Sequence, residues 1–342
     1  IMKKLVFLMV ALFGISVAQA QIKINYDSIK SLYESAAKAS ITNEDLVTQT
    51  APVSFLDENG LMRQGAQEQI ATASAMLSVF HRLDDVVWSQ EVYRIVDMRF
   101  KQNYPLYTPL SADDPVNSSL LKTMLMAIGN GMPVFSKSET GDIRPTFNFS
   151  NMQIGPDALS LLDAERAGNY DPDDEENRAF QRVLKPDSIT GNLVVNASSF
   201  PGYAKNQLKY LIKEVVFFDK HYCRLYSEIE AIAPLHAENG DMELKGMTAT
   251  ESIYSQILFW VRYNDFRPYM TQKYVSPRDN DSKRVTFDDF FRLKLYSSYI
   301  LGINNVYGRM VPEIAKTYED IQREQKKIEA NLLNIEQDLW EY

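Results

Sequence analysis

The chain has a single cysteine, Cys223, among its 342 residues. One cysteine cannot form a disulfide within the chain, so stability has to come from buried apolar surface. Histidine is almost as scarce, with three residues, and their spacing does not predict a zinc site. The serine-hydrolase, zinc-protease, P-loop and dinucleotide-binding fingerprints are all missing. No motif therefore indicates a reaction, although carboxylates distant in sequence could still form a hydrolase site.

Positive charge is also in short supply, since 36 Lys and Arg stand against 45 Asp and Glu. An acidic protein does not bind nucleic acid or anionic lipid through its overall field. Apolar residues make up 45% of the chain, which is enough for a substantial packed core. The length fits one large domain or two ordinary ones.

Long apolar runs are confined to the first twenty residues. Two lysines precede an apolar run from Leu5 to Val17, and the Ala-Gln-Ala tripeptide that follows fits a signal-peptidase site. The run is shorter than the roughly 20 residues that a spanning helix needs. We expect residues 1–20 to be a signal peptide that is cleaved between Ala20 and Gln21. No cysteine stands directly after the run, where a lipid would be attached, so we expect an exported chain that carries no lipid and does not insert into a membrane.

Residues 21–83 are predicted to form an N-terminal arm with short helices. Ile22, Tyr26 and Ile29 recur at helical spacing, and Ala66–Arg82 is rich in helix formers with one apolar face. The arm can be a loosely packed subdomain, or it can wrap around a partner. Both interpretations stay open.

Residues 84–312 are predicted to form the main domain. Amphipathic helices are expected over Asp84–Phe100, Ser118–Ile128 and Thr286–Leu301. The stripe of the first consists of Trp88, Val92, Ile95 and Val96. Asn117 is expected to cap the start of the second helix and Thr286 the start of the third. Gly129 and Gly302 are expected to end them. An acidic cluster at 171–176 fails the EF-hand pattern and is predicted to be a solvated loop.

The clearest local pattern is an antiparallel hairpin over Lys209–Pro234. Its first half is rich in β-branched and aromatic residues, Asp219 and Lys220 form a polar break, and the second half alternates in polarity. The alternation predicts that Cys223 points into the core, where a thiol is inert. An intermolecular disulfide is the alternative. Leu258–Tyr263 is predicted to be a further strand.

Residues 313–342 are predicted to form a long terminal helix. Its apolar residues recur at steps of four and three, with one polar interruption at Gln325. A seam of this kind either docks on its own domain or pairs with another chain. In the second case the partner-binding residues would be Ile321, Ile328, Leu332, Ile335 and Leu339. These elements together predict an α+β fold with one main domain, an antiparallel sheet, packed helices, an N-terminal arm and a long C-terminal helix.

Six short segments, in a fixed order, carry a family resemblance. They are Asp84–Pro109, Ile212–Lys220, Ala231–Leu235, Val285–Phe291, Ser298–Ile300 and Asn305–Tyr307. The first, DDVVWSQEVYRIVDMRFKQNYPLYTP, departs from the family pattern at Val96 and Phe100. As a set they resemble the GldN/PorN family of gliding-motility and type IX secretion proteins, and in detail the PorN members most closely. The arm and the acidic cluster carry no family motif.

The resemblance implies a structural, non-enzymatic role without cofactor, metal or catalytic residues. It implies a periplasmic protein that assembles with a GldK/PorK-like outer-membrane lipoprotein into a ring at the inner face of the outer membrane. It also implies self-association around that ring and contact with a GldM/PorM-like inner-membrane motor protein.

Two other functions stay open on the residues themselves. An exported cell-envelope hydrolase would show two opposed carboxylates and a raised pKa. A soluble periplasmic binding or chaperone-like protein would show a preformed apolar pocket.

Overall fold

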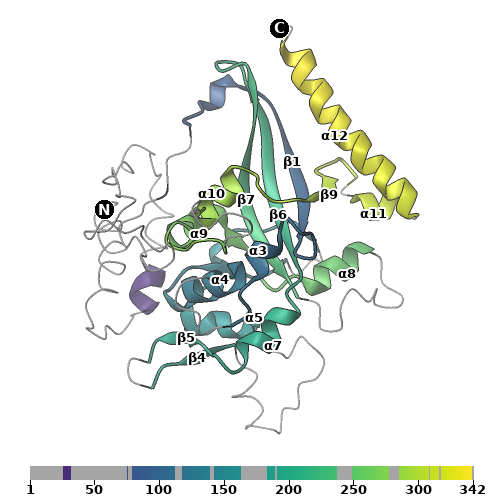
Figure 1. Ribbon diagram of the computed structural model, residues 1–342. Coiled ribbons are helices and arrows are strands. Elements are labelled where there is room, and N and C mark those ends of the chain that lie inside the picture. The colour runs from purple at the N-terminus through teal and green to yellow at the C-terminus, as the bar shows by residue number, and fades with distance from the viewer. Residues whose placement is uncertain are drawn as a thin grey trace, which may run out of the picture.

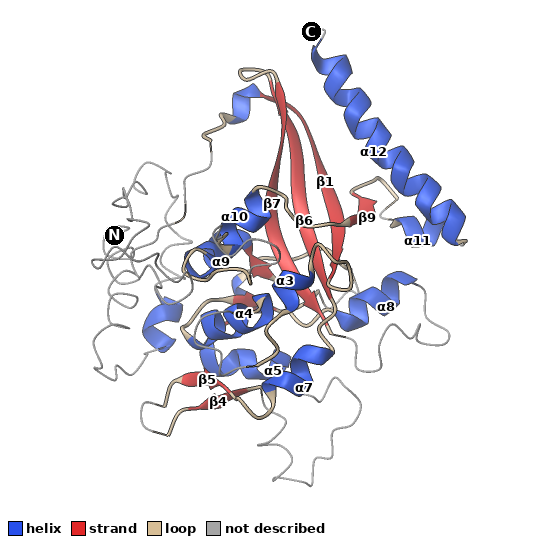
Figure 2. Ribbon diagram, in the orientation of Figure 1, coloured by secondary structure: helices blue, strands red, loops and turns tan. Residues whose placement is uncertain are grey.

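A five-stranded antiparallel sheet forms the centre of the computed structural model, in the order β8-β7-β6-β1-β9. The structure describes residues 26–31, 75, 79–111, 118–138, 142–162, 183–188, 191–236, 249–276, 285–307, 309–315 and 317–340. Most of the short helices gather around one end of the sheet, while its other end projects beyond them (Figure 1, Figure 2). The α+β class that the sequence predicted is confirmed.

The predicted hairpin is the spine of this sheet. Strands β6 (Lys209–Asp219) and β7 (Arg224–Leu235) pair along their whole length, with Asp219 opposite Arg224. Strand β1 (Val86–Asp97) pairs with the other side of β6. The short strands β8 (Val261–Arg262) and β9 (Tyr299–Ile303) form the two edges. The strand expected over Leu258–Tyr263 is therefore reduced to two residues.

The helix predicted over Asp84–Phe100 is wrong, because this segment contains β1. Val92 and Val96 face one side of the sheet, while Tyr93 and Ile95 face the other. A strand that is buried on both faces shows a continuous apolar run instead of clean alternation, and such a run also fits a helical stripe.

The helix predicted from Ser118 exists as α4 (Leu120–Gly129), with a different cap. The Ser119 side chain accepts the backbone N–H of Lys122 at 3.3 Å, whereas Asn117 lies outside the described residues. Gly129 is the last helical residue and does not follow the helix. It is a glycine because a Cβ there would lie 2.4 Å from the backbone oxygen of Leu193.

The helix predicted over Thr286–Leu301 begins as expected but ends early, as α10 (Phe287–Arg292). Thr286 caps it by accepting the backbone N–H of Asp289 at 3.1 Å. The end is a Schellman motif without glycine, since Lys294 has a φ of 50° and the N–H of Leu295 reaches the carbonyl of Phe290 at 3.0 Å. A lysine at this position gave no stop signal in the sequence. The chain then turns back to form β9.

The remaining elements are short, and most of them lie around the helical end of the sheet (Figure 1). The helices among them are η3 (Leu83–Asp85), α3 (Tyr104–Tyr107), η4 (Phe149–Asn151), η5 (Gly155–Ala158), α5 (Leu159–Leu162), α7 (Phe200–Lys205), α8 (Ala249–Gln256), α9 (Tyr263–Met270) and α11 (Val311–Ile314). Two small antiparallel pairs complete the list, β2 (Val134–Phe135) with β3 (Met152–Gln153), and β4 (Leu184–Pro186) with β5 (Leu193–Val195).

The sheet separates two cores. On one face, Val96, Ile212 and Ile232 pack against residues from α4, α9 and α10. On the other face, Ile95, Leu211 and Ala233 pack around Trp260, which is fully buried. The helical end of the sheet is thus buried on both sides, and its strands are held rigidly.

The terminal helix α12 (Tyr318–Trp340) runs beside the projecting part of the sheet (Figure 1). It starts later than predicted, because α11 holds Pro312 and the chain breaks helical conformation at Ala315. Among the helices that the structure describes, none is both long enough and apolar enough to cross a bilayer.

The first predicted helix of the arm is present at residues 26–31 and packs on the main domain. The Tyr26 hydroxyl donates to the carbonyl of Gly129 at 2.7 Å and accepts the N–H of Leu193 at 3.1 Å. The helix predicted over Ala66–Arg82 does not include 79–82, which are not helical, and most of it lies outside the described residues. The Ala20–Gln21 cleavage site and the acidic cluster at 171–176 also lie outside them.

Candidate interaction surfaces

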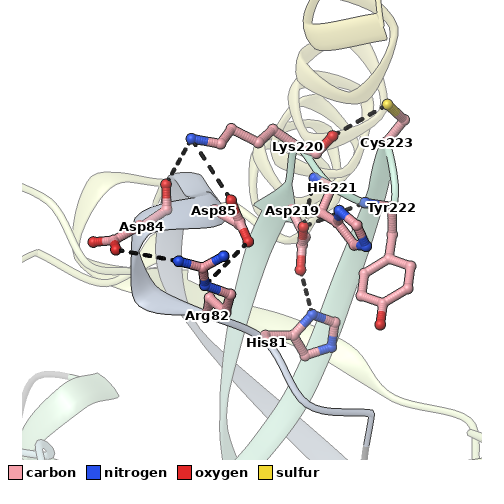
Figure 3. A network of polar contacts seen from close by, with 9 residues as sticks. All are labelled: His81, Arg82, Asp84, Asp85, Asp219, Lys220, His221, Tyr222 and Cys223. Carbon is pink, nitrogen blue, oxygen red and sulfur yellow. Dashed lines mark hydrogen bonds and ion pairs between the residues drawn. The ribbon is translucent and has the colours of Figure 1, made fainter.

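The tip of the β6–β7 hairpin holds a polar cluster around Asp219 (Figure 3). The Asp219 side chain is buried, and one of its oxygens lies 2.5 Å from Nδ1 of His81. Its other oxygen accepts the backbone N–H of His221 at 2.8 Å and that of Tyr222 at 3.3 Å. The carboxylate therefore closes the turn and fastens the chain that enters β1 to the hairpin.

Aromatic rings enclose the His81 side of this cluster. The rings of Phe217, Tyr222 and Tyr226 lie around the imidazole, with centroids 4.9, 5.6 and 4.3 Å away. Burial acts most strongly on the pKa of Asp219 and would raise it, but the hydrogen bonds from His81 and the two backbone N–H groups together hold that pKa below its ordinary value. We interpret the cluster as a clasp that gives the projecting tip a fixed shape.

Cys223 lies in the turn of the hairpin and is exposed, so the prediction that it points into the core is wrong. The two-residue period does not apply to it, because β7 begins only at Arg224. Its φ of 49° lies in the left-handed region, and its Sγ is 3.3 Å from the carbonyl oxygen of Lys220.

A buried ionic network lies in the middle of β6. Glu214 is fully buried and pairs with Arg94 of β1, accepts the Ser227 hydroxyl at 2.9 Å and lies 3.3 Å from Nζ of Lys294. Burial would raise the pKa of Glu214, and the two cations together with the hydrogen bonds hold it below its ordinary value. The network joins β1, β6, β7 and the left-handed end of α10, so its role is structural.

The seam of α12 meets the sheet at its middle. Leu332 is buried in a cluster with Val92, Val216 and Ile300, and Ile328 packs against it. The one polar seam residue, Gln325, donates from Nε2 to the carbonyl oxygen of Ile300 at 2.8 Å. The centre of the seam therefore docks on its own domain.

The other seam residues that the sequence singled out are only partly buried. Ile321 lies near the start of α12, and Ile335 and Leu339 lie toward its end. Their contact with a partner chain stays a prediction.

A groove of about 370 Å³ lies on the face of the sheet opposite α12. Val215 and Phe217 line it, and they alternate along β6 with Val216, which contacts the α12 cluster. Phe147 adds a third apolar side chain. No motif announced this groove in the sequence, because its residues come from distant segments.

The rim of the groove is acidic. Arg262 donates to Asp265 at 2.7 Å, and Glu230 lies 2.8 Å from Nζ of Lys213. Glu228 is exposed, and no partner for its carboxylate is found within the described residues. Burial raises the pKa of Asp265 against the opposing effect of Arg262.

A tight loop after β9 presents two large apolar side chains to solvent. Val306 is 99% exposed and Tyr307 is 82% exposed. The Asn305 side chain holds the loop through four hydrogen bonds, with the carbonyls of Ile303 and Arg309 at 3.2 and 2.6 Å and the N–H groups of Tyr307 and Arg309 at 3.0 and 3.1 Å. The sequence gave the segment only as part of the family resemblance, and its exposure follows from the fold.

The three histidines are divided between the two ends of the hairpin. His81 and His221 lie at the hairpin tip, while His236 follows the opposite end of β7 and stacks on Tyr203 at 4.7 Å. Within the described residues, no three His, Cys, Asp or Glu side chains form a metal-binding group.

The described residues thus present a rigid sheet with a clasped tip, an acidic groove and an apolar loop, which are features of a protein that works through its surfaces. Residues 81–341 match the family described as gliding motility associated protein GldN. The chain belongs to this family, and it is a component of gliding-motility or type IX secretion machinery. Comparison with curated proteins finds no match. The match begins at His81, the residue that fastens the chain to the hairpin tip.

Proposed function

We propose that this protein is a non-enzymatic structural component of a periplasmic type IX secretion ring. In this proposal it assembles with a GldK/PorK-like lipoprotein at the inner face of the outer membrane and contacts a GldM/PorM-like inner-membrane motor protein. The observation that carries the proposal is the family match over most of the chain, from residue 81 to residue 341.

The geometry supports an assembling role. A ring component needs lateral contacts to its neighbours and separate surfaces for other partners. The groove adjoins the hairpin tip at Phe217, while the loop after β9 lies at an edge of the sheet, so one protomer presents at least two separate surfaces to partners. The strands that carry them are anchored by two cores and by the Glu214 network, which fixes their relative positions.

Recruitment to the membrane is the direct test. The chain is expressed for export with and without the lipoprotein, and outer-membrane fractions are probed for it. We expect recovery there only with the lipoprotein, and loss of recovery when the lipid-attachment cysteine of the lipoprotein is replaced. Intact-mass measurement of the recovered chain should give a start at Gln21 and no acyl group. A chain that never associates with the lipoprotein would contradict the proposal.

The groove gives the hydrolase alternative one point of support. Three carboxyl groups, those of Asp265, Glu228 and Glu230, line one concave site, and the pKa of Asp265 is raised. Against this, Arg262 already holds Asp265 in an ion pair. Cell-wall hydrolysis that disappears in Asp265→Asn, with folding unchanged, would favour the enzyme over the structural component.

A further inference from the structure

The loop after β9 has the properties of a preformed contact. Single exposed apolar residues are common on protein surfaces, but here two adjacent ones are held outward by a side chain that makes four hydrogen bonds. Arg309, which is also exposed, follows them in the same loop. Tyr and Arg are the residues that most often dominate binding energy at interfaces, and residues whose backbone is already held by hydrogen bonds lose little entropy on binding.

The acidic groove has the complementary character. Its floor is apolar and aromatic, with Phe147, Val215 and Phe217, and its volume of about 370 Å³ lies at the small end of the range for binding pockets. Tyr307 can place its ring on this floor. Arg309 can then reach the rim, where Glu228 has no cation partner among the described residues.

The two features lie in different halves of the sheet within one chain. The loop follows β9 at one edge of the sheet, and the groove spans the region from β6 to the residues after β8 at the other edge. Strand β9 is two strand spacings, about 10 Å, from β6, where the groove begins, and four spacings, about 19 Å, from β8. An apolar knob at one edge and a groove over the other half of the sheet are two different surfaces, and their pairing between copies is a head-to-tail contact, which closes into a ring or extends as a filament.

We propose that the Val306–Tyr307–Arg309 knob of one copy binds the acidic groove of the next copy of this chain. This inference rests on the proposed ring function and specifies the lateral contact within it. The occupant is a second copy because the same chain carries both complementary parts, with Arg309 in the knob and Glu228, unpaired among the described residues, at the groove, and displays them on different halves of one sheet.

Two surface variants separate the halves of this contact. Tyr307→Asp removes the knob and leaves the groove intact, and Glu228→Lys repels Arg309 and leaves the knob intact. Both positions are exposed, so the fold tolerates the changes. Matched controls are Leu293→Asp, at a position 64% exposed, and Glu329→Lys on the exposed side of α12.

Self-association is measured by sedimentation velocity over a concentration series. The wild-type chain and both controls should form oligomers, and each test variant should weaken association at least about tenfold. An equal mixture of the two test variants should form a dimer and nothing larger, because one intact knob meets one intact groove. A two-fold symmetric interface would close the wild type as a dimer, whereas the head-to-tail contact predicts wild-type oligomers larger than a dimer.

Three outcomes would overturn the inference: a wild-type chain that stays monomeric, test variants that assemble like the wild type, and a mixture that remains monomeric. Recruitment by the lipoprotein is scored separately on the same variants. If recruitment holds while the knob variants have no effect on self-association, the lateral contact fails and the proposed function stands.

Discussion

At the scale of single residues, the left-handed turn positions show how local rules are overridden. Cys223 and Lys294 both have positive φ, at 49° and 50°, where glycine is the usual residue. Each is held there by hydrogen bonds of the turn that it belongs to. Without glycine at these places, the sequence did not show that the hairpin turn extends to Cys223 or that α10 stops before Lys294, and this explains why a cysteine was predicted buried and a helix was predicted too long.

Cys223 should react with thiol reagents in the folded protein at nearly the rate of the unfolded chain, because its side chain is exposed. Cys223→Gly should leave stability unchanged or raise it by roughly 0.5 kcal/mol, since glycine relieves the left-handed strain at a small entropic cost. Cys223→Val should destabilise by about 1 kcal/mol. Thiol labelling and urea unfolding measure these effects, and slow labelling of the native protein would contradict the exposed position.

His236 predicts a loss of stability in weak acid. Burial lowers its pKa to about 4, below the 6.5 of an unfolded histidine. Above pH 6.5 the ring is neutral in both the folded and the unfolded state, so the free energy of unfolding does not depend on pH through His236. Between pH 6.5 and 4 the unfolded state takes up a proton that the folded state refuses, so the free energy of unfolding falls as the pH falls, by up to about 3 kcal/mol.

The measurement is urea unfolding of the wild type and of His236→Gln between pH 4 and 7. The variant should lose this part of the pH dependence. His221→Gln, at an exposed position, serves as the matched control and should keep it. Equal slopes in the wild type and His236→Gln would show that His236 titrates normally.

At the scale of elements, the apolar seam of α12 is buried only over part of its length. Only its centre reaches the sheet, where Leu332 is 8% exposed, while the adjacent Leu333 is 61% exposed. A helix with a narrow apolar seam is stabilised at the positions where the seam is buried, and substitutions at its exposed positions have little effect on stability.

Leu332→Ala should therefore lower the free energy of unfolding by about 2–3 kcal/mol, because it leaves a cavity among Val92, Val216 and Ile300. Leu333→Ala changes the same residue type one position further on and should cost less than about 0.5 kcal/mol. Equal losses for the two would show that α12 does not dock in this register.

At the scale of the whole molecule, the N-terminal segment belongs to the body of the protein. Tyr26 donates to the carbonyl of Gly129, and Cβ atoms at two further glycines, Gly131 and Gly155, would lie 2.5 Å and 2.3 Å from Ile29 and Tyr26. The glycines thus leave the space in which this helix sits. The predicted arm is, over this stretch, a packed element.

Tyr26→Phe should reduce stability by about 1 kcal/mol, because the ring stays and the two hydrogen bonds to Gly129 and Leu193 are lost. Tyr318→Phe is the control, since that side chain is 74% exposed. Hydrogen exchange should rise at residues 26–31 in Tyr26→Phe alone. If the exchange is unchanged, the hydroxyl does not hold the segment.

The sequence by itself determined the elements whose pattern is local. The β-branched residues and the polar turn predict the β6–β7 hairpin. The apolar seam predicts that α12 is a helix, and Thr286 predicts where α10 starts. The family was also readable from short segments in order, because each is a contiguous run. These features depend only on residues that are close together in the chain, so a single sequence is enough to predict them.

The tertiary structure decided everything that depends on distant partners. Whether Val86–Asp97 is a strand was settled by pairing with β6 and β9, since a segment buried on both sides loses its period. The chain after α10 becomes an edge strand because β1 offers it hydrogen bonds. The groove and the exposed knob arise from segments brought together or held apart by the sheet. Their positions on different halves of the sheet follow from strand order, which no local pattern in the sequence encodes.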